Sequence, residues 1–269
     1  MRINTNMSAL TALNQSNKNT ALASSSMGKL SSGLRINQAG DDAAGLAISE
    51  KMRSQIRGME QADRNVQDGI SLVQTAEGAL EESGNILQRM RELTVQGGND
   101  TLNDDDREKI ATELEQLGEE LDKIAEETKF NGIELLDGTN TTITIQAGAN
   151  DEVRDITLEN LSDIATNVSA LTVDDNATAQ TSQEAVQTAL DSVNEARANL
   201  GAMQNRLEAT SSNLTTSTEN LTAAESRIRD VDIASEMMNL SKLNLLTQAS
   251  QAMMSQAKSQ PEGVMQLLR

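Results

Sequence analysis

The chain has 269 residues and a formal net charge of −19 at pH 7, and it contains no Cys, His, Trp or Tyr. Without cysteine there is no disulfide framework and no thiolate metal site, and without histidine most hydrolytic and zinc-dependent chemistry loses its usual residues. These absences predict a protein that is not an enzyme, and we assign it no catalytic residue, no metal and no cofactor.

The charge is unevenly distributed along the sequence. Residues 100–175 hold 21 acids and five bases, whereas residues 1–36 hold four bases and no acid. Phosphate binding requires clustered Lys and Arg, so this distribution argues against nucleic acid as a partner. The sequence shows no signal peptide and no apolar run long enough to cross a bilayer, so no membrane partner is expected and export would need a specialised route.

Residues 1–36 carry an imperfect apolar heptad pattern. The apolar residues at heptad spacing are Ile3, Leu10, Leu13, Met27 and Leu34. Polar side chains occupy the remaining positions of the same seam, namely Asn17, Thr20 and Ser24. One such helix pair can hardly offset a backbone ordering cost of ~1–2 kcal/mol per residue, so we expect this segment to order against many copies packed side by side. Frayed or disordered tails are the alternative.

An unbroken apolar ladder predicts the first long helix. Its members, spaced by seven, are Met52, Met59, Val66, Val73, Leu80 and Leu87. This repeat keeps one seam of a helix facing a partner, with a gentle left-handed supercoil. Asp41 and Asp42 supply N-cap chemistry, and Gly97 with Gly98 ends the helix.

A shorter helix is predicted next, capped by Asn103. Its first turn contains Asp104, Asp105 and Asp106, which complement the helix dipole. These acids are the only metal-like cluster, but their spacing lacks the glycine and the closing Glu of a calcium loop. We therefore assign them to the helix end and not to a metal site.

After Phe130 the apolar period changes to two. Ile143 and Ile145 alternate with threonines, and Ile156 and Leu158 alternate again after a turn rich in Gly and Asn. This pattern predicts a β-hairpin at about residues 139–160. Residues 161–180 are ambiguous.

A second ladder predicts the long return helix. Its members are Val186, Val193, Leu200, Leu207, Leu214, Leu221 and Ile228. Thr181 and Glu184 have capping-box spacing and predict its start. The last segment again mixes apolar residues with Ser, Gln and Asn. The expected fold is therefore mainly α, an elongated antiparallel helical bundle or coiled coil with a small β-hairpin region.

Three stretches resemble the signatures of bacterial flagellin. They are LSSGLRINQAGDDAAGLAIS at residues 30–49, NLTAAESRIRDVDIA at residues 220–234 and the ending QASQAMMSQAKSQPEGVMQLLR. The likeness covers roughly residues 1–138 and 180–269, and it leaves a short middle without room for the outer domains of larger flagellins. The resemblance implies a structural subunit that self-assembles into the flagellar filament, the propeller for swimming.

The resemblance also implies a division of the chain. Residues 1–42 and 235–269 would form the inner coiled-coil core of the filament, and residues 43–234 a helical rod domain that includes the hairpin. The expected core assembly residues are Ile3, Leu10, Leu13, Met27, Leu34, Leu240, Leu243, Leu246, Met253 and Leu267. Export through the flagellar type III apparatus would place the protein in the extracellular filament.

Implied partners are other copies of the chain, hook-associated junction and cap proteins, and a flagellin export chaperone. The segment LQRMRELTVQ is similar to the surface bound by the Toll-like flagellin receptor of vertebrate hosts. Residue by residue, that likeness selects Arg89, Leu93 and Glu113. The alternative is that these three are ordinary residues of the rod.

Three other kinds of protein are alternatives to the filament subunit. A hook-filament junction protein also has helical ends and self-associates, but NLTAAESRIRDVDIA and the leucine-rich terminus favour the filament subunit. A flagellin with a metallopeptidase insert would need a zinc motif, which a chain without His cannot supply. A generic coiled-coil adaptor would form stable dimers in dilute solution, whereas a filament subunit should stay monomeric until nucleated.

Overall fold

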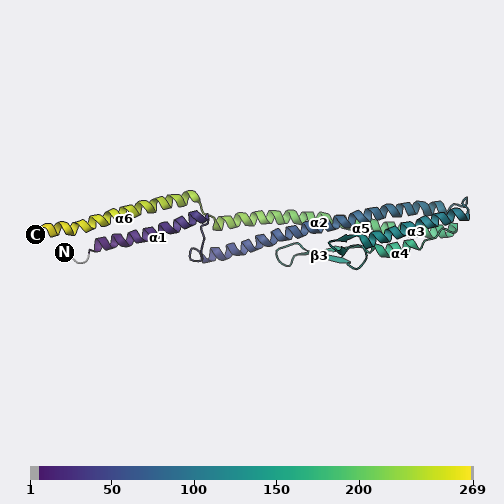
Figure 1. Cartoon of the computed structure of the whole chain (residues 1–269), viewed down its shortest axis with the longest axis horizontal. Helices are drawn as coiled ribbons and strands as arrows, with labels where there is room; N and C mark the ends of the chain where they lie inside the picture. The colour runs from purple at the N-terminus through teal and green to yellow at the C-terminus, as the bar shows by residue number, and fades with distance from the viewer. Residues whose placement is uncertain (1–5, 268–269) are drawn as a thin grey trace. The chain divides into compact units, whose positions relative to one another are not determined.

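The structure is a computed structural model that describes residues 6–267, with side chains described up to residue 259. The helices are α1 (Met7–Ser32), α2 (Ala43–Gly97), α3 (Asp104–Glu127), α4 (Leu161–Ser169), α5 (Asn176–Arg229) and α6 (Ile233–Leu267) (Figure 1). The strands are β1 (Lys129–Phe130), β2 (Ile133–Glu134), β3 (Thr142–Gln146) and β4 (Val153–Thr157). The predicted fold class, mainly helical with a small hairpin region, is confirmed.

The chain forms two compact units. Unit 1 contains residues 1–54 and 220–269, and unit 2 contains residues 55–219. The predicted boundaries after residues 42 and 234 separate the filament core from the rod. They describe the assembled filament, so they stay predictions.

The predicted helix ends agree with the structure at three positions, and at two of them a side-chain hydrogen bond caps the helix. The Asp42 carboxylate accepts from the backbone N–H of Gly45 at 2.9 Å, and α2 ends at Gly97. The Asn103 side chain accepts from the N–H of Asp106 at 2.8 Å and so caps α3. Each cap satisfies one of the N–H groups that a helix leaves without an internal partner.

The predicted start of the return helix is wrong. The helix α5 begins at Asn176, and the Thr181 hydroxyl donates to the carbonyl oxygen of Ala177 at 3.1 Å inside the helix. The cap is formed earlier, because Asp175 accepts from the N–H of Thr178 at 2.7 Å while its own N–H donates to the Thr178 hydroxyl at 2.9 Å. Residues 161–180, left open by the sequence, hold α4 and this cap.

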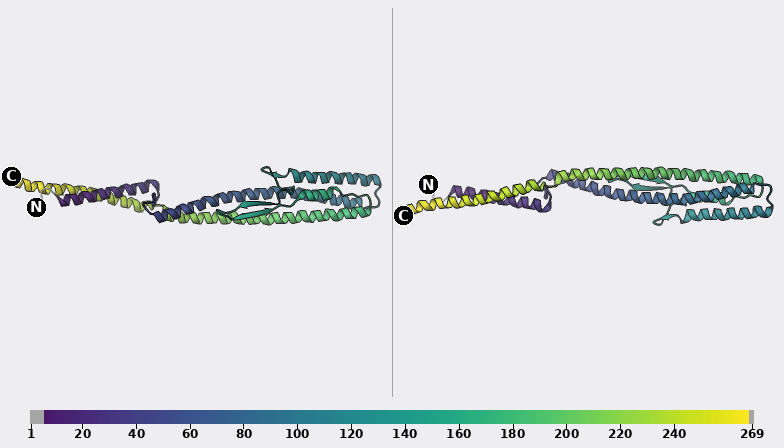
Figure 2. Two further views of the ribbon diagram at one scale, coloured as in Figure 1. Left: turned by 90° about the horizontal axis from the view of Figure 1, so that it is seen from below. Right: turned by 90° about the horizontal axis from the view of Figure 1, so that it is seen from above.

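In unit 2 the two ladders form a core between α2 and α5, which lie side by side (Figures 1 and 2). Every ladder residue from Met59 to Leu87 and from Val186 to Leu214 is buried. Burying one such side chain stabilises the fold by roughly 1.5–3 kcal/mol. A hydrogen bond of 2.6 Å from the Ser211 hydroxyl to the Asp63 carboxylate also joins the two helices.

The hairpin β3–β4 packs on α2. Its antiparallel register pairs Ile143 with Ile156, and Ile156 is fully buried. The packing is close, because a Cβ atom at Gly69 would lie 3.2 Å from a side-chain carbon of Ile145. The Asn65 side chain also donates to the carbonyl oxygen of Gln146 at 3.2 Å.

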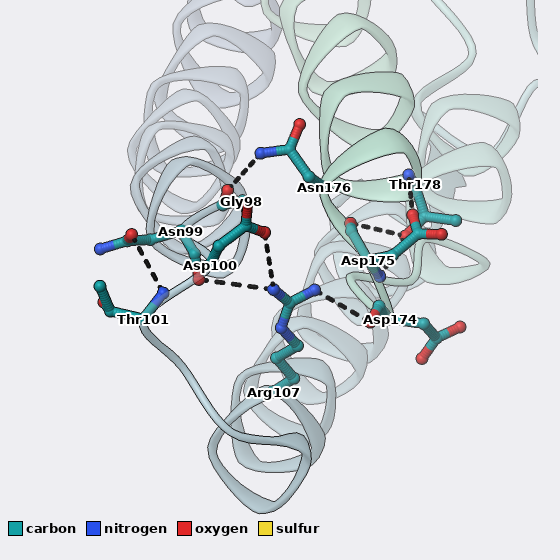
Figure 3. A network of polar contacts seen from close by, with 9 residues as sticks. All are labelled: Gly98, Asn99, Asp100, Thr101, Arg107, Asp174, Asp175, Asn176 and Thr178. Atoms are coloured by element: carbon teal, nitrogen blue, oxygen red, sulfur yellow. Dashed lines mark hydrogen bonds and ion pairs between the residues drawn. The ribbon is translucent and has the colours of Figure 1, made fainter.

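A polar network around Arg107 of α3 joins three segments of unit 2 (Figure 3). Its guanidinium donates to the carbonyl oxygen of Asp174 at 2.9 Å and lies 3.5 Å from the Asp100 carboxylate. The Asn176 side chain donates to the carbonyl oxygen of Gly98 at 2.5 Å. These contacts fix the α2–α3 connection against the start of α5, so their role is structural.

Candidate self-assembly surface

In unit 1, α1 and α6 lie side by side along their length (Figures 1 and 2). The α1 residues least exposed to solvent recur at spacings of three and four and are mostly small. They are Ala9, Ala12, Ser16, Asn19, Ala23, Ser26 and Leu30. The matching positions of α6 are Glu236, Leu240, Leu243, Thr247, Ser250, Met254 and Ala257. Small side chains along a heptad seam allow two helices to approach closely.

This seam lies one residue before the seam predicted for residues 1–36. Leu10, Leu13 and Met27 point into solvent, with exposed fractions of 47%, 40% and 60%. Apolar spacing alone indicated a partner for them, and the partner is not α6 of the same chain. Leu34 is half-buried where it pairs with Asp230 beyond α5.

The remaining predicted assembly residues divide in the same way. Leu240 and Leu243 are half-buried in the seam, whereas Leu246 and Met253 are exposed. Ile3 lies outside the described residues, and Leu267 ends α6 with its side chain outside them.

Large apolar side chains cover the outer faces of α1 and α6. Those exposed are Met7, Leu10, Leu13, Leu22 and Met27 on α1, and Ile233, Met237, Met238, Leu245, Leu246 and Met253 on α6. In the described part of unit 2, only Val95, Ile133 and Val153 are comparably exposed. Charges are few, because Lys18 and Lys29 are the only charged residues of α1. Large apolar side chains exposed in this number on one helix pair are typical of an interaction surface.

Two grooves hollow this surface. One, of about 590 Å³, lies between α1 and α6, and its lining includes Met7, Asn19, Leu246 and Met253. The other, of about 660 Å³, runs along α6 beside Met237 and Leu245. Both offer apolar side chains to a docking segment.

A backbone clamp holds the connections of unit 1 together. Leu34 and Asp230 form an isolated antiparallel bridge. The N–H of Val231 donates to the carbonyl oxygen of Gly33 at 3.0 Å. The Arg229 guanidinium donates to the Glu50 carboxylate at 2.7 Å. The clamp ties the α1–α2 connection to the α5–α6 connection.

The residues selected as a receptor surface all lie in unit 2, but two of them are exposed to solvent and one is buried. Arg89 of α2 and Glu113 of α3 form an ion pair of 2.8 Å on the surface. Hydrogen bonds to Glu113, and then to Glu92, raise the pKa of the Arg89 guanidinium. Leu93, however, is only 2% exposed, because it faces the helical core. The Leu93 side chain is therefore not on the surface in this conformation, and its part in receptor binding stays a prediction.

Among the side chains described, those of residues 6–259, no group of three or more Asp and Glu is arranged to hold a metal ion. Over the same range, no helix is long and apolar enough to cross a membrane. The Asp104–Asp106 cluster serves the first turn of α3.

A helix pair that closes through small residues and turns its large apolar side chains outward defines a self-associating coiled-coil protein. Residues 3–141 match the family model of the bacterial flagellin N-terminal helical region, and residues 183–268 match that of the bacterial flagellin C-terminal helical region. The chain belongs to the bacterial flagellin family.

Similar proteins agree with this assignment. Flagellin from Halalkalibacterium halodurans is 54% identical over 272 residues, which cover 100% of both chains. The crystal structure of Bacillus cereus flagellin, at 36% identity, has a TM-score of 0.52 and covers 60% of this chain and 94% of that one. A putative flagellar hook-associated protein from Vibrio parahaemolyticus has a TM-score of 0.60 over 71% of this chain and 100% of its own, but its 15% identity shows the fold alone.

The chain is therefore a structural subunit that self-assembles into the bacterial flagellar filament, and it is not an enzyme. The hook-filament junction alternative has less support, since the hook-associated likeness is confined to the fold.

Proposed function

We propose that residues 1–42 and 235–269 form the inner core of the filament and that residues 43–234 form its rod. The exposed apolar faces of α1 and α6 carry this proposal. Leu10, Met27, Leu246 and Met253 are large and apolar, and among the described residues no helix of the same chain covers them. Docking of other copies would remove these side chains from water, and this burial would stabilise the assembly by roughly 25 cal/mol per Å² of apolar surface.

A fragment experiment tests the division. A fragment of residues 43–234 keeps both ladders, the capped helix α3 and the hairpin, so it should unfold cooperatively on heating. Because it lacks α1 and α6, it should not join filaments grown from seeds, whereas the intact chain should join them. The intact chain should also become resistant to protease at both ends. Normal filaments grown from the fragment would refute the division.

Single substitutions test the surface itself. Leu246→Ser places a hydroxyl on the exposed face of α6 and should raise the critical concentration for seeded growth about tenfold, the equivalent of ~1.4 kcal/mol. Val95→Ser is the matched control, since Val95 is 55% exposed in unit 2. Equal critical concentrations for the two variants would exclude the α6 face.

We also propose that the protein is exported through the flagellar type III apparatus and resides in the extracellular filament. Before assembly, the apolar face of α6 needs protection from premature contact, which a dedicated export chaperone would provide. Deletion of residues 236–269 should abolish chaperone binding in a pull-down. Full-affinity binding by the truncated chain would contradict this assignment.

Hook-associated junction and cap proteins are the further expected partners in the flagellum. Each end of a filament leaves the α1–α6 surface of its last copies without a neighbour, so a protein with similar helices would fit there. Purified junction protein should nucleate growth of the intact chain and not of the Leu246→Ser variant. Nucleation of both at the same rate would place the contact elsewhere.

For a vertebrate host we propose that the Toll-like flagellin receptor contacts Arg89 and Glu113. Both side chains are on the surface, and their ion pair presents opposite charges together. Arg89→Ala should lower activation of reporter cells by monomeric protein, and Arg91→Ala, another exposed arginine of α2, is the control. Unchanged activation by Arg89→Ala would remove this surface from consideration.

A further inference from the structure

The α1–α6 seam buries one polar side chain that is only partly hydrogen-bonded. Asn19 lies near the middle of α1 and is 3% exposed. Its amide oxygen accepts from the Gln15 side chain at 3.2 Å, but its amide nitrogen has no hydrogen-bond partner. Leaving such a donor buried and unpaired destabilises the fold, and an alanine or leucine at the same place would avoid that penalty.

The unpaired amide adjoins the groove between α1 and α6. Asn19 lines that groove together with Gln15 and Ala12 of α1 and with Leu246 and Met253 of α6. Five of its ten lining residues are apolar and five are polar, namely Ser8, Thr11, Gln15, Asn19 and Ser250. Among these described residues, the Asn19 amide nitrogen is the buried side-chain donor that has no hydrogen-bond partner. A segment that fills the groove and carries an oxygen at the right height would pair with the Asn19 NH₂ group.

We propose that Asn19 sets the register of assembly, because its amide donates to an oxygen of a second copy of this chain docked in the groove. The second copy is the fitting occupant. Its own α1 and α6 present apolar stripes that match Leu246 and Met253, and members of this family form filaments from one repeated chain. This inference rests on the proposed assembly role of α1 and α6.

The chemistry explains how one residue can select a register. Apolar stripes tolerate sliding, since contact between methyl and methylene groups changes little with a shift along the helix. A single buried amide has only one position in which it is paired, so every other register leaves it without an acceptor. Buried asparagine at a seam position fixes register in coiled coils in this way, at a cost in stability.

Substitutions separate register setting from simple packing. Asn19→Leu and Asn19→Asp both remove the donor, and both should raise the critical concentration for seeded growth about tenfold, as expected for one hydrogen bond. Ser26→Ala is the control, because Ser26 is another buried polar residue of the seam and does not line the groove. It should stay within about twofold of the unchanged chain. Circular dichroism of each monomer checks that helix content is kept.

Comparing seeded growth of the Leu246→Ser and Asn19→Leu variants separates the role of Asn19 from the role of the apolar surface. If Leu246→Ser impairs growth and Asn19→Leu does not, the surface stands and the role of Asn19 is overturned. If neither variant impairs growth, the surface itself is wrong and the Asn19 role falls with it.

A direct measurement does not depend on any variant folding. Filaments are grown from a mixture of copies, half with ¹⁵N-labelled asparagine and half with ¹³C-labelled carbonyl and carboxyl carbons. Solid-state NMR should show magnetisation transfer between the Asn19 side-chain nitrogen and a ¹³C carbon of a different copy. No transfer to the Asn19 amide in well-ordered filaments would overturn the proposal.

Discussion

The backbone N–H of Arg35 donates to the carbonyl oxygen of Arg229 across 2.6 Å, although the two residues belong to opposite ends of the chain. The Arg35 guanidinium adds a contact of 2.5 Å to the carbonyl oxygen of Ile228. Two connections that each lack regular structure thus hold one another by backbone hydrogen bonds. A change in one connection should therefore be felt in the other.

Arg229→Ala should loosen this clamp. The Arg229 side chain is 12% exposed and pairs with Glu50 at 2.7 Å, so its loss removes a partly buried ion pair. We expect cleavage by trypsin after Arg35 to become about three- to tenfold faster, as for local opening made easier by ~1 kcal/mol. Arg227→Ala, at an exposed position in the same turn, is the control. Equal cleavage rates for the two variants would show that the backbone bonds suffice.

Leu93 and Val95 form a matched pair on α2. Leu93 is 2% exposed and Val95 55% exposed. Leu93→Ala leaves a cavity in the core and should lower the free energy of unfolding by about 2–5 kcal/mol, whereas Val95→Ala should change it by less than about 1 kcal/mol. Urea unfolding followed by circular dichroism measures both. A small effect at Leu93 would mean that its side chain is solvated, and it would return Leu93 to the candidate receptor surface.

The long helices were predictable because their apolar ladders repeat without a gap. Each ladder has an apolar residue at every expected position, and members such as Val66, Leu80 and Leu207 are buried in the structure. Helix ends were predictable where a capping side chain stands alone, as Asn103 does. They were not where two candidates compete. Thr181 has the right spacing for a cap, but Asp175, six residues earlier, forms the cap together with Thr178.

The seam of α1 could not be predicted from apolar spacing. Leu10, Leu13 and Met27 follow a heptad, but a heptad says only that a helix has a partner and not which partner it is. In the structure, small residues of α1 such as Ala12 and Ser16 face α6, and the large apolar residues of α1 face outward. The large apolar residues of α1 are therefore left for the contact with other copies that we propose. The sequence signal that could have indicated this seam was the recurrence of alanine and serine at spacings of three and four.

The cap of α5 should make stability depend on pH. The backbone N–H of Thr178, and then its side chain, lower the pKa of Asp175 below its ordinary value of 3.8. A lowered carboxyl pKa stabilises the fold fully above the unfolded value, and that stabilisation is lost as pH falls through the folded pKa. Asp175→Ala should therefore lower the thermal unfolding midpoint by a few degrees at pH 7, and the difference should shrink below pH 3.8.

Asp174→Ala is the control for the cap, since the Asp174 side chain is exposed and only its backbone oxygen binds Arg107. Its unfolding midpoint should match that of the unchanged chain at every pH. A difference between Asp175→Ala and the unchanged chain that persisted unaltered at pH 2 would show that the carboxylate charge does not contribute.

Methionine oxidation should report which surface assembly covers. Met7, Met27, Met237, Met238 and Met253 are 50–69% exposed on α1 and α6, whereas Met59 and Met90 are at most 9% exposed in unit 2. Hydrogen peroxide converts an accessible thioether to the sulfoxide and is itself reduced to water, which makes an apolar side chain polar. In the monomer, site-resolved mass spectrometry should therefore find the five exposed residues oxidised first.

Assembly should slow the oxidation of those methionines that lie at contacts between copies. In filaments we expect Met253 and Met238 to oxidise at least about tenfold more slowly than in the monomer, because burial excludes peroxide. Monomer oxidised beforehand should elongate seeds poorly, since sulfoxides on α6 oppose apolar docking, and treatment with methionine sulfoxide reductase should restore growth. Met90, fully buried in both states, gives the baseline rate. Unchanged oxidation of Met238 and Met253 on polymerisation would mean that this face of α6 stays open to solvent in the filament.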